Sequence, residues 1–175
     1  MFHYTDLPVF GQMGPKTEMD SSVHPPIVRK FHCLLDMLPK SEIWTIFPCV
    51  IVGKELADKL RQSRCSAYEI QTVIVEGGDA FRHFHGKTMP LPELYWCHIT
   101  GKPYADDLGF ADRSKLIVSD KAKTLIEFGQ HEGVSFLTGD HPPTDEEIDA
   151  RIWAHAAKVA QELIELHTPT ITKVE

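Results

Sequence analysis

RSKLIVSDKAKTLIEFGQHEGVSFL, residues 113–137, has the pattern of a strand, a capped helix and a second strand. The short β-rich run LIV ends at Ser119, whose hydroxyl stands where a helix N-cap accepts an early helical N–H. The apolar positions that follow recur with the helical period of about 3.6 residues, and two glycines bracket the return to an extended pattern. This pattern predicts strands at 115–118 and 134–137 joined by a helix at 119–129.

A fainter copy of the same pattern lies at residues 49–70. Its strand leads through Gly53, at the cap position, into a helical stripe over 54–63, and a second extended run follows. Strand, cap and helix often follow one another in mixed folds, so the pattern alone leaves open whether this is a repeat. If it is a repeat, the two units are expected to share one layered core.

The whole chain has the pattern of an α+β fold, with a mixed or mostly antiparallel sheet packed by two short helices and one long C-terminal helix. Prolines and glycines over residues 1–40 predict an irregular N-terminal arm. The α+β body is expected over 41–139, and 140–175 is expected to add a helix and tail to the same single domain. Pro48 marks an edge position or a bulge in its strand. The strands are expected near 31–37, 43–52, 67–76, 93–99, 115–118 and 134–137.

The C-terminal helix carries the strongest local signal. Thr144 and Glu147 have the spacing of a capping box, and the neighbouring acids stand at the positive end of the helix dipole. Apolar residues then recur at heptad-like spacing, which predicts a helix over 144–166. Its apolar seam packs either on the body or on a partner, so a homodimer through this helix stays open.

Composition is that of an ordinary globular protein, with 42% hydrophobic and 25% charged residues in 175. No apolar run approaches the roughly 20 residues of a membrane span, and the N-terminus has no secretory-signal pattern, so a cytoplasmic protein without membrane contact is expected. The four cysteines are spread singly and are expected as small buried hydrophobes. The net charge of −7 argues against direct nucleic-acid binding and suits a basic protein partner.

A metal site is the main catalytic alternative. His83 and His85, with His98 across a hairpin, would supply imidazole ligands, and two histidines at this spacing share one face of a strand. Glu76 or Asp79 would then serve as the base of a metal-dependent hydrolase. No C-x-x-C or H-E-x-x-H motif, nucleophile elbow or phosphate loop accompanies these residues, so no metal, cofactor or catalytic residue is expected.

Three groups of residues between 91 and 137 occur in the order of a known family pattern. CHITG at 97–101 keeps the first cysteine and the glycine of a C-x-x-C-G motif, with Thr100 in place of the second cysteine. DLGF at 107–110 follows, and then LIVSDKA at 116–122 with GVSF at 133–136. On these residues the chain resembles the double-CXXCG motif immunity proteins and their cysteine-poor relatives among bacterial polymorphic-toxin immunity proteins. With Thr100 replacing a ligand, the zinc site of those relatives is not carried over.

The resemblance implies a cytoplasmic immunity protein, without enzymatic activity, that binds and neutralises a cognate toxin, expected to be a nuclease effector. A nuclease presents a cationic cleft, which an acidic surface with aromatic anchors can cover. A metal-dependent hydrolase and a dimeric regulatory or scaffold protein remain the alternatives. The expected partner-binding residues are a central loop and, second, the acids around the helix cap: Tyr104, Asp106, Asp107, Phe110 and Asp112, then Asp140, Asp145, Glu146 and Glu147.

Overall fold

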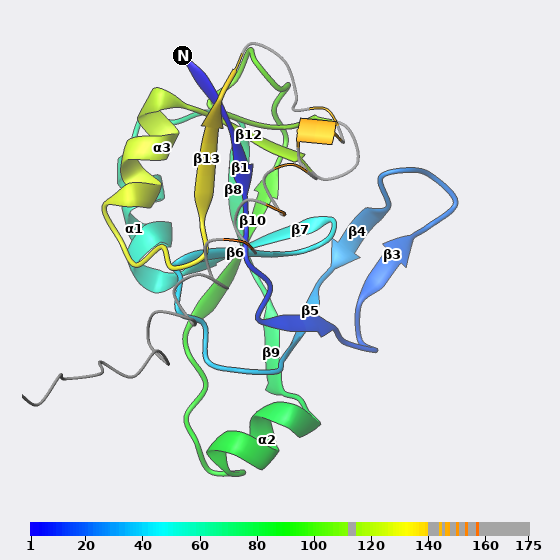
Figure 1. Ribbon diagram of the computed structural model, residues 1–175. Helices are drawn as coiled ribbons and strands as arrows, with labels where there is room; N and C mark the ends of the chain where they lie inside the picture. Colours follow the sequence, from blue (N-terminus) through cyan, green and yellow to red (C-terminus); the bar gives the residue numbers. More distant parts are fainter. Residues whose placement is uncertain are drawn as a thin grey trace, which may run out of the picture. The chain divides into compact units, whose positions relative to one another are not determined.

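The computed structural model describes residues 1–111 and 115–139, together with positions 144, 146, 147, 150, 153 and 157. The chain separates into two compact units, 1–142 and 143–175, which are described separately. The described part of the first unit is α+β with mostly antiparallel sheets, as the sequence predicts (Figure 1). No helix among the described residues is long and apolar enough to cross a membrane.

The described elements of the first unit follow one another in short segments. The strands are β1 (Phe2–Asp6), β2 (Gly11–Met13), β3 (Glu18–Asp20), β4 (Ile27–Lys30), β5 (His32–Leu35), β6 (Ile43–Ile46), β7 (Cys49–Gly53), β8 (Tyr68–Thr72), β9 (Ile74–Gly77), β10 (Leu94–Ile99), β11 (Leu108–Ala111), β12 (Lys115–Ser119) and β13 (Ser135–Thr138). The helices are α1 (Lys54–Gln62), α2 (Asp79–His85) and α3 (Asp120–Glu127).

Two four-stranded antiparallel sheets share one plan, with strand orders β6-β7-β10-β8 and β11-β12-β1-β13. In each sheet a hairpin leads directly into a helix, and the helix leads to the strand at the far edge. A strand from elsewhere in the chain is inserted between the hairpin and that edge strand: β10 in one sheet and β1 in the other. Each of these two sheets with its helix is therefore a split β-α-β arrangement, which we call a split unit. The first split unit contains α1 and the second contains α3. The helices α1 and α3 lie side by side (Figure 1).

The two split units also match in register at the start of the helix. In both, the last residue of the second hairpin strand is the N-cap, and its N–H donates to a carbonyl just before the first strand: Gly53 to Glu42 and Ser119 to Asp107, each at 2.9 Å. The fainter sequence pattern at 49–70 thus corresponds to a second copy of the 113–137 architecture.

The strand β7 is buried along its whole length because it lies between two cores. Side chains alternate across a strand, so Val50 and Val52 face one core while Cys49 and Ile51 face the other. The first core is shared by the two split units and includes the buried apolar residues of both helices: Leu56, Ala57 and Leu60 of α1 and Ala122 and Ile126 of α3. The shared layered core predicted for two similar units is therefore present.

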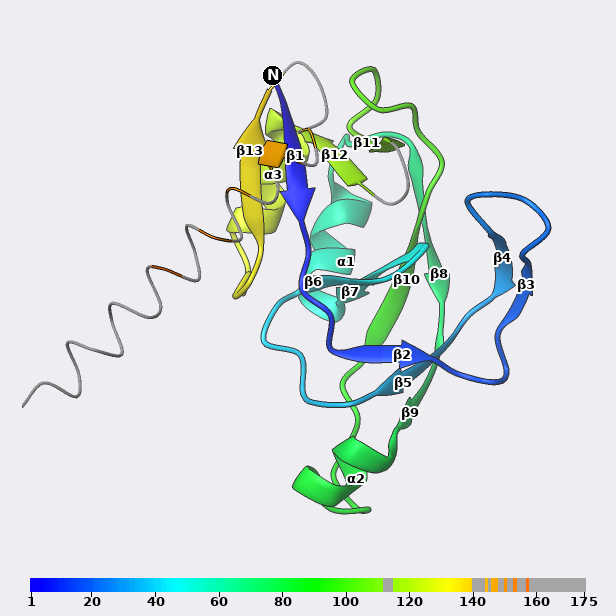
Figure 2. The ribbon, with the colours of Figure 1, turned by 45° about the vertical axis from the view of Figure 1, so that its right-hand side comes forward.

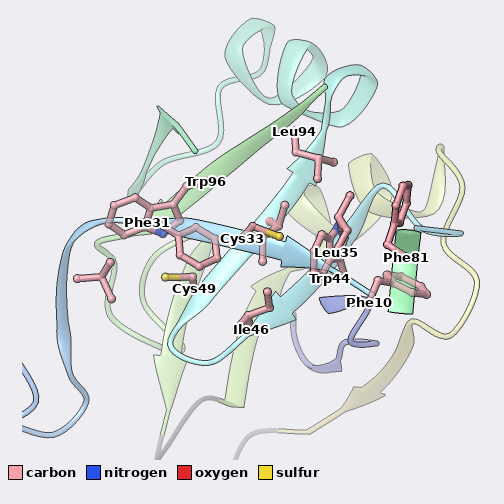
Figure 3. Close-up of a cluster of buried hydrophobic side chains, with 12 residues drawn as sticks. Phe10, Phe31, Cys33, Leu35, Trp44, Ile46, Cys49, Phe81, Leu94 and Trp96 are labelled. Atoms are coloured by element: carbon pink, nitrogen blue, oxygen red, sulfur yellow. The ribbon is translucent and has the colours of Figure 1, made fainter. Parts of the chain in front are cut away.

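The second core contains the large aromatic side chains (Figure 3). Phe10 packs edge-on against Trp44 with ring centroids 5.8 Å apart, and Phe31 packs edge-on against Trp96 at 6.1 Å. Phe10 immediately precedes β2 and Phe31 lies between β4 and β5, so these contacts attach β2, β4 and β5 to the sheet that contains β7. Offset and edge-to-face pairs of this kind add to the stabilisation from burial alone.

Three expectations for the first unit are wrong. The first forty residues are not an irregular arm, because they contain β1 to β5 and β1 lies inside a sheet. The run 43–52 is a hairpin that turns at Phe47 and Pro48, and not one strand with a bulge. The run 67–76 is two strands in different sheets, β8 paired with β10 and β9 paired in parallel with β5.

In the second unit, the predicted capping box is present. The Thr144 N–H donates to the Glu147 carboxylate at 2.7 Å, and the Glu147 N–H donates to Thr144 Oγ1 at 3.2 Å. Positions 146, 147, 150, 153 and 157 are helical. The rest of the helix predicted over 144–166, including its apolar seam, lies outside the described residues.

Candidate functional site

A cavity of about 580 Å³ opens between the β3–β4 hairpin, the β6–β7 turn and the ends of β10 and β11. We call it the hairpin hollow. The described side chains that line it are mostly apolar and include no carboxylate, lysine or arginine. They are His24, Pro25, Pro26, Ile27, Val28, Phe47, Pro48, Cys49, Trp96, His98, Ile99, Phe110 and Ala111. The size and the apolar lining are typical of a binding pocket.

The β3–β4 hairpin projects from the body of the first unit, away from α1 and α3 (Figure 2). Two ring contacts fix its base and its end. Phe31, directly after β4, packs on Trp96, and His24 in the hairpin loop lies over Phe47 with ring centroids 5.9 Å apart. The hollow therefore has one wall from the hairpin, and the rest of its lining comes from the β6–β7 turn and the strands β7, β10 and β11.

His98 is the main polar side chain on the sheet side of the hollow. Its ring lies 5.0 Å from the ring of Trp96, and its Nδ1 lies 3.4 Å from Gln71 Nε2 and 3.8 Å from a Glu69 carboxylate oxygen. Cys49 also lines the hollow, but burial raises the pKa of its thiol to about 12, so it is a neutral group at physiological pH.

The acidic-aromatic loop predicted as the partner surface has mainly internal contacts. Asp107 is 18% exposed and accepts hydrogen bonds from Ser119 Oγ at 2.6 Å and from the Ser66 N–H at 2.9 Å. Burial acts to raise the pKa of Asp107, but these bonds and the nearby Lys121 outweigh it, so the pKa lies below its ordinary value. Asp107 therefore holds the start of α3.

The other loop residues separate into different surroundings. Asp106 accepts the Lys102 N–H at 2.8 Å, and Tyr104, at a left-handed φ of 61°, places its ring edge-on to Phe2. Among the described residues of this loop, only Phe110 lines the hairpin hollow. Glu146 and Glu147 are exposed at the start of the C-terminal helix. Asp112, Asp140 and Asp145 lie outside the described residues.

Sequence reasoning missed most of the hollow. His24, Ile27 and Phe47 belong to segments that were expected as an irregular arm or as the interior of a strand. One signal was available: VHPPI at 23–27 and FP at 47–48 combine apolar residues with prolines, and an apolar residue held in a turn is usually exposed.

The predicted alternative metal site does not form. His83 and His85 lie on α2, and residues two apart do not share a helical face. Their rings pack instead on Phe84 and Phe81. Throughout the part of the chain that the structure describes, no three His, Cys, Asp or Glu side chains are grouped as metal ligands. The metal hypothesis requires residues 83–85 to be extended, whereas they lie in the helix α2, which has Asp79 in its first turn and buries Phe81.

Comparisons with protein-family models, with curated proteins and with solved structures give no match. The structure by itself defines an α+β protein in which two split β-α-β units share a core, and a hollow opens between the β3–β4 hairpin and strands of both units.

Proposed function

We propose that this chain is a cytoplasmic immunity protein, one that binds a cognate bacterial toxin with a nuclease domain and neutralises it. The family resemblance of residues 97–136 gives the class of protein, and two features of the folded chain support a binding role. These are the hairpin hollow and the acidic charge of the chain.

The hollow is the observation that carries the proposal. Two large apolar side chains of its lining remain in contact with solvent: Ile27 is 55% exposed and Phe47 39%. A contiguous apolar surface around a cavity is costly in water, and in folded proteins it commonly marks a site where another molecule binds. Phe110, which the sequence places in the partner surface, lines the same cavity.

The charge supports the kind of partner. A nuclease needs a cationic cleft for phosphates, and a protein with a net charge of −7 is attracted to such a surface before any contact forms. The acidic charge raises the rate of encounter, and buried apolar anchors then slow dissociation. Neither step requires a covalent bond to be made or broken.

The test is protection of cells by the chain. A large secreted protein with a toxic C-terminal domain is expected to be encoded next to this gene, and its toxic domain is expressed with and without the chain. We expect growth to be restored only when the chain is present, together with recovery of a one-to-one complex. A neighbouring toxin that kills equally well in the presence of the soluble chain would overturn the proposal.

A further inference from the structure

We propose that the hairpin hollow receives a large uncharged side chain, aromatic or branched aliphatic, from the protein that this chain binds. The inference rests on the proposed function and identifies the part of the toxin that the hollow recognises.

The lining of the hollow selects an uncharged occupant. Its walls include the rings of Phe47, Trp96 and Phe110, and none of its described lining side chains is a carboxylate, a lysine or an arginine. A charged side chain inserted there would lose its water without gaining an ion pair, which is strongly unfavourable. An aromatic or aliphatic side chain gains burial and ring contacts instead.

The mouth of the hollow indicates a protein rather than a free small molecule. A compound that filled the cavity would leave the exposed faces of Ile27 and Phe47 in water. A protein surface that places one side chain in the hollow covers this rim as well. A central anchor surrounded by contacts that exclude water is the usual arrangement at protein interfaces.

Charges beside the hollow complement a basic partner. Asp20 lies directly across the hairpin from Ile27, and Glu69 lies across the strand pair from His98. Both carboxylates flank the cavity without lining it, and the side chain of Glu69 is largely exposed. Of the two cations on β4, Arg29 is exposed and Lys30 pairs with Glu18 at 3.2 Å. The hollow thus accepts a neutral anchor next to acids that can meet cationic neighbours.

The first experiment uses N-acetyl-tryptophanamide as a neutral aromatic probe and N-acetyl-argininamide as a charged one, each titrated into the full chain and followed by NMR. We expect the neutral probe to shift the signals of the Trp96 indole and the Ile27 methyl groups, and the charged probe to leave them unmoved. Shifts confined to residues outside the hollow, or equal shifts with both probes, would overturn the inference.

Two matched variants locate the effect. Ile27→Asp places a charge at the mouth, whereas Met19→Asp places one on the same hairpin at a residue that is 48% exposed and does not line the hollow. We expect Ile27→Asp to weaken the neutral probe and the toxin complex by about tenfold or more, and Met19→Asp to change neither by more than about twofold. Thermal unfolding checks that both variants fold, and equal losses in the two folded variants would contradict the inference.

Experiments with the toxin distinguish failure of this inference from failure of the proposed function. Displacement of the neutral probe by the toxin supports the inference, whereas a ternary complex shows that the toxin leaves the hollow unfilled and overturns it. Undiminished toxin binding by Ile27→Asp also overturns it, and leaves the proposed function in place. A wild-type chain that binds no toxin overturns the proposed function whatever the probe does.

Discussion

Glu42 and Asp107 occupy equivalent positions in the two split units, and each is matched to its helix cap. A Cβ built on Gly53 would lie 2.4 Å from a carboxylate oxygen of Glu42, which accepts the Leu56 N–H at 3.1 Å. In the second split unit, Ser119 takes the place of the glycine, and the shorter side chain of Asp107 accepts a hydrogen bond from the Ser119 hydroxyl. Glu42 has one methylene more than Asp107, and the space for it is left by the missing side chain at Gly53.

Gly53→Ala tests this matching. The added methyl group pushes the Glu42 carboxylate away from the Leu56 N–H and offers no acceptor in exchange, so we expect a loss of about 1 kcal/mol in the free energy of unfolding. Urea denaturation measures it. The double variant Glu42→Asp with Gly53→Ser gives the first split unit the Asp–Ser pair found in the second split unit, and it is expected to recover most of the loss. Unchanged stability in Gly53→Ala would show that Glu42 does not cap α1.

Asp107→Asn tests whether the Asp107 carboxylate stabilises the start of α3 in the second split unit. Because the folded-state pKa of Asp107 lies below its ordinary value of 3.8, its charge stabilises the fold above that pH, and this contribution disappears as pH falls through the lower, folded-state pKa. We expect Asp107→Asn to lose about 1–3 kcal/mol at neutral pH and much less in strong acid. Urea denaturation at several pH values measures both, and an equal loss at every pH would contradict the role.

At the scale of elements, the helices that show an apolar stripe were predictable and the polar strands were not. α1 and α3 lie where the 3.6-residue period places them, and β10, β12 and β13 lie close to their predicted bounds. β1 has no apolar alternation to detect, because its buried side chains are His3 and Thr5. The His3 ring is held by Asp120 at 2.7 Å and Thr138 at 2.9 Å, which are distant in sequence.

Tyr4→Pro tests whether β1 is an integral strand. Tyr4 lies opposite Ile117 on one side and Leu137 on the other, and proline cannot donate a hydrogen bond within such a sheet. We expect a loss of about 3 kcal/mol or more, measured by thermal and urea unfolding. The control is Val9→Pro, at an exposed residue between strands, with a small effect. Equal effects from the two would restore the interpretation of this segment as a loose arm.

The candidate site was harder to predict than the fold because its residues come from four separate segments. Phe110 was assigned to the partner surface and His98 to a metal site, yet both line the same hollow. Asp106 and Asp107 have the composition of a contact surface, but their carboxylates accept backbone N–H groups within the chain. A single sequence gives no way to tell an acid that binds a partner from one that caps a loop.

At the scale of the whole molecule, the acidic charge predicts how association with the toxin depends on salt. We expect the association rate constant to fall by about tenfold or more between low and high ionic strength, since salt screens the attraction between opposite charges. The dissociation rate is expected to change much less, because apolar anchors control it. Stopped-flow fluorescence measures both rates, and a salt-independent association rate would argue against a basic partner.

The most direct test of a binding role is a titration of the purified toxin domain with the purified chain while nuclease activity is recorded. We expect nuclease activity to fall in proportion to the chain added and to vanish at one equivalent, with the toxin recovered intact from the complex. Full nuclease activity at a large excess of folded chain, or covalent change of the toxin by substoichiometric amounts of it, would contradict the account.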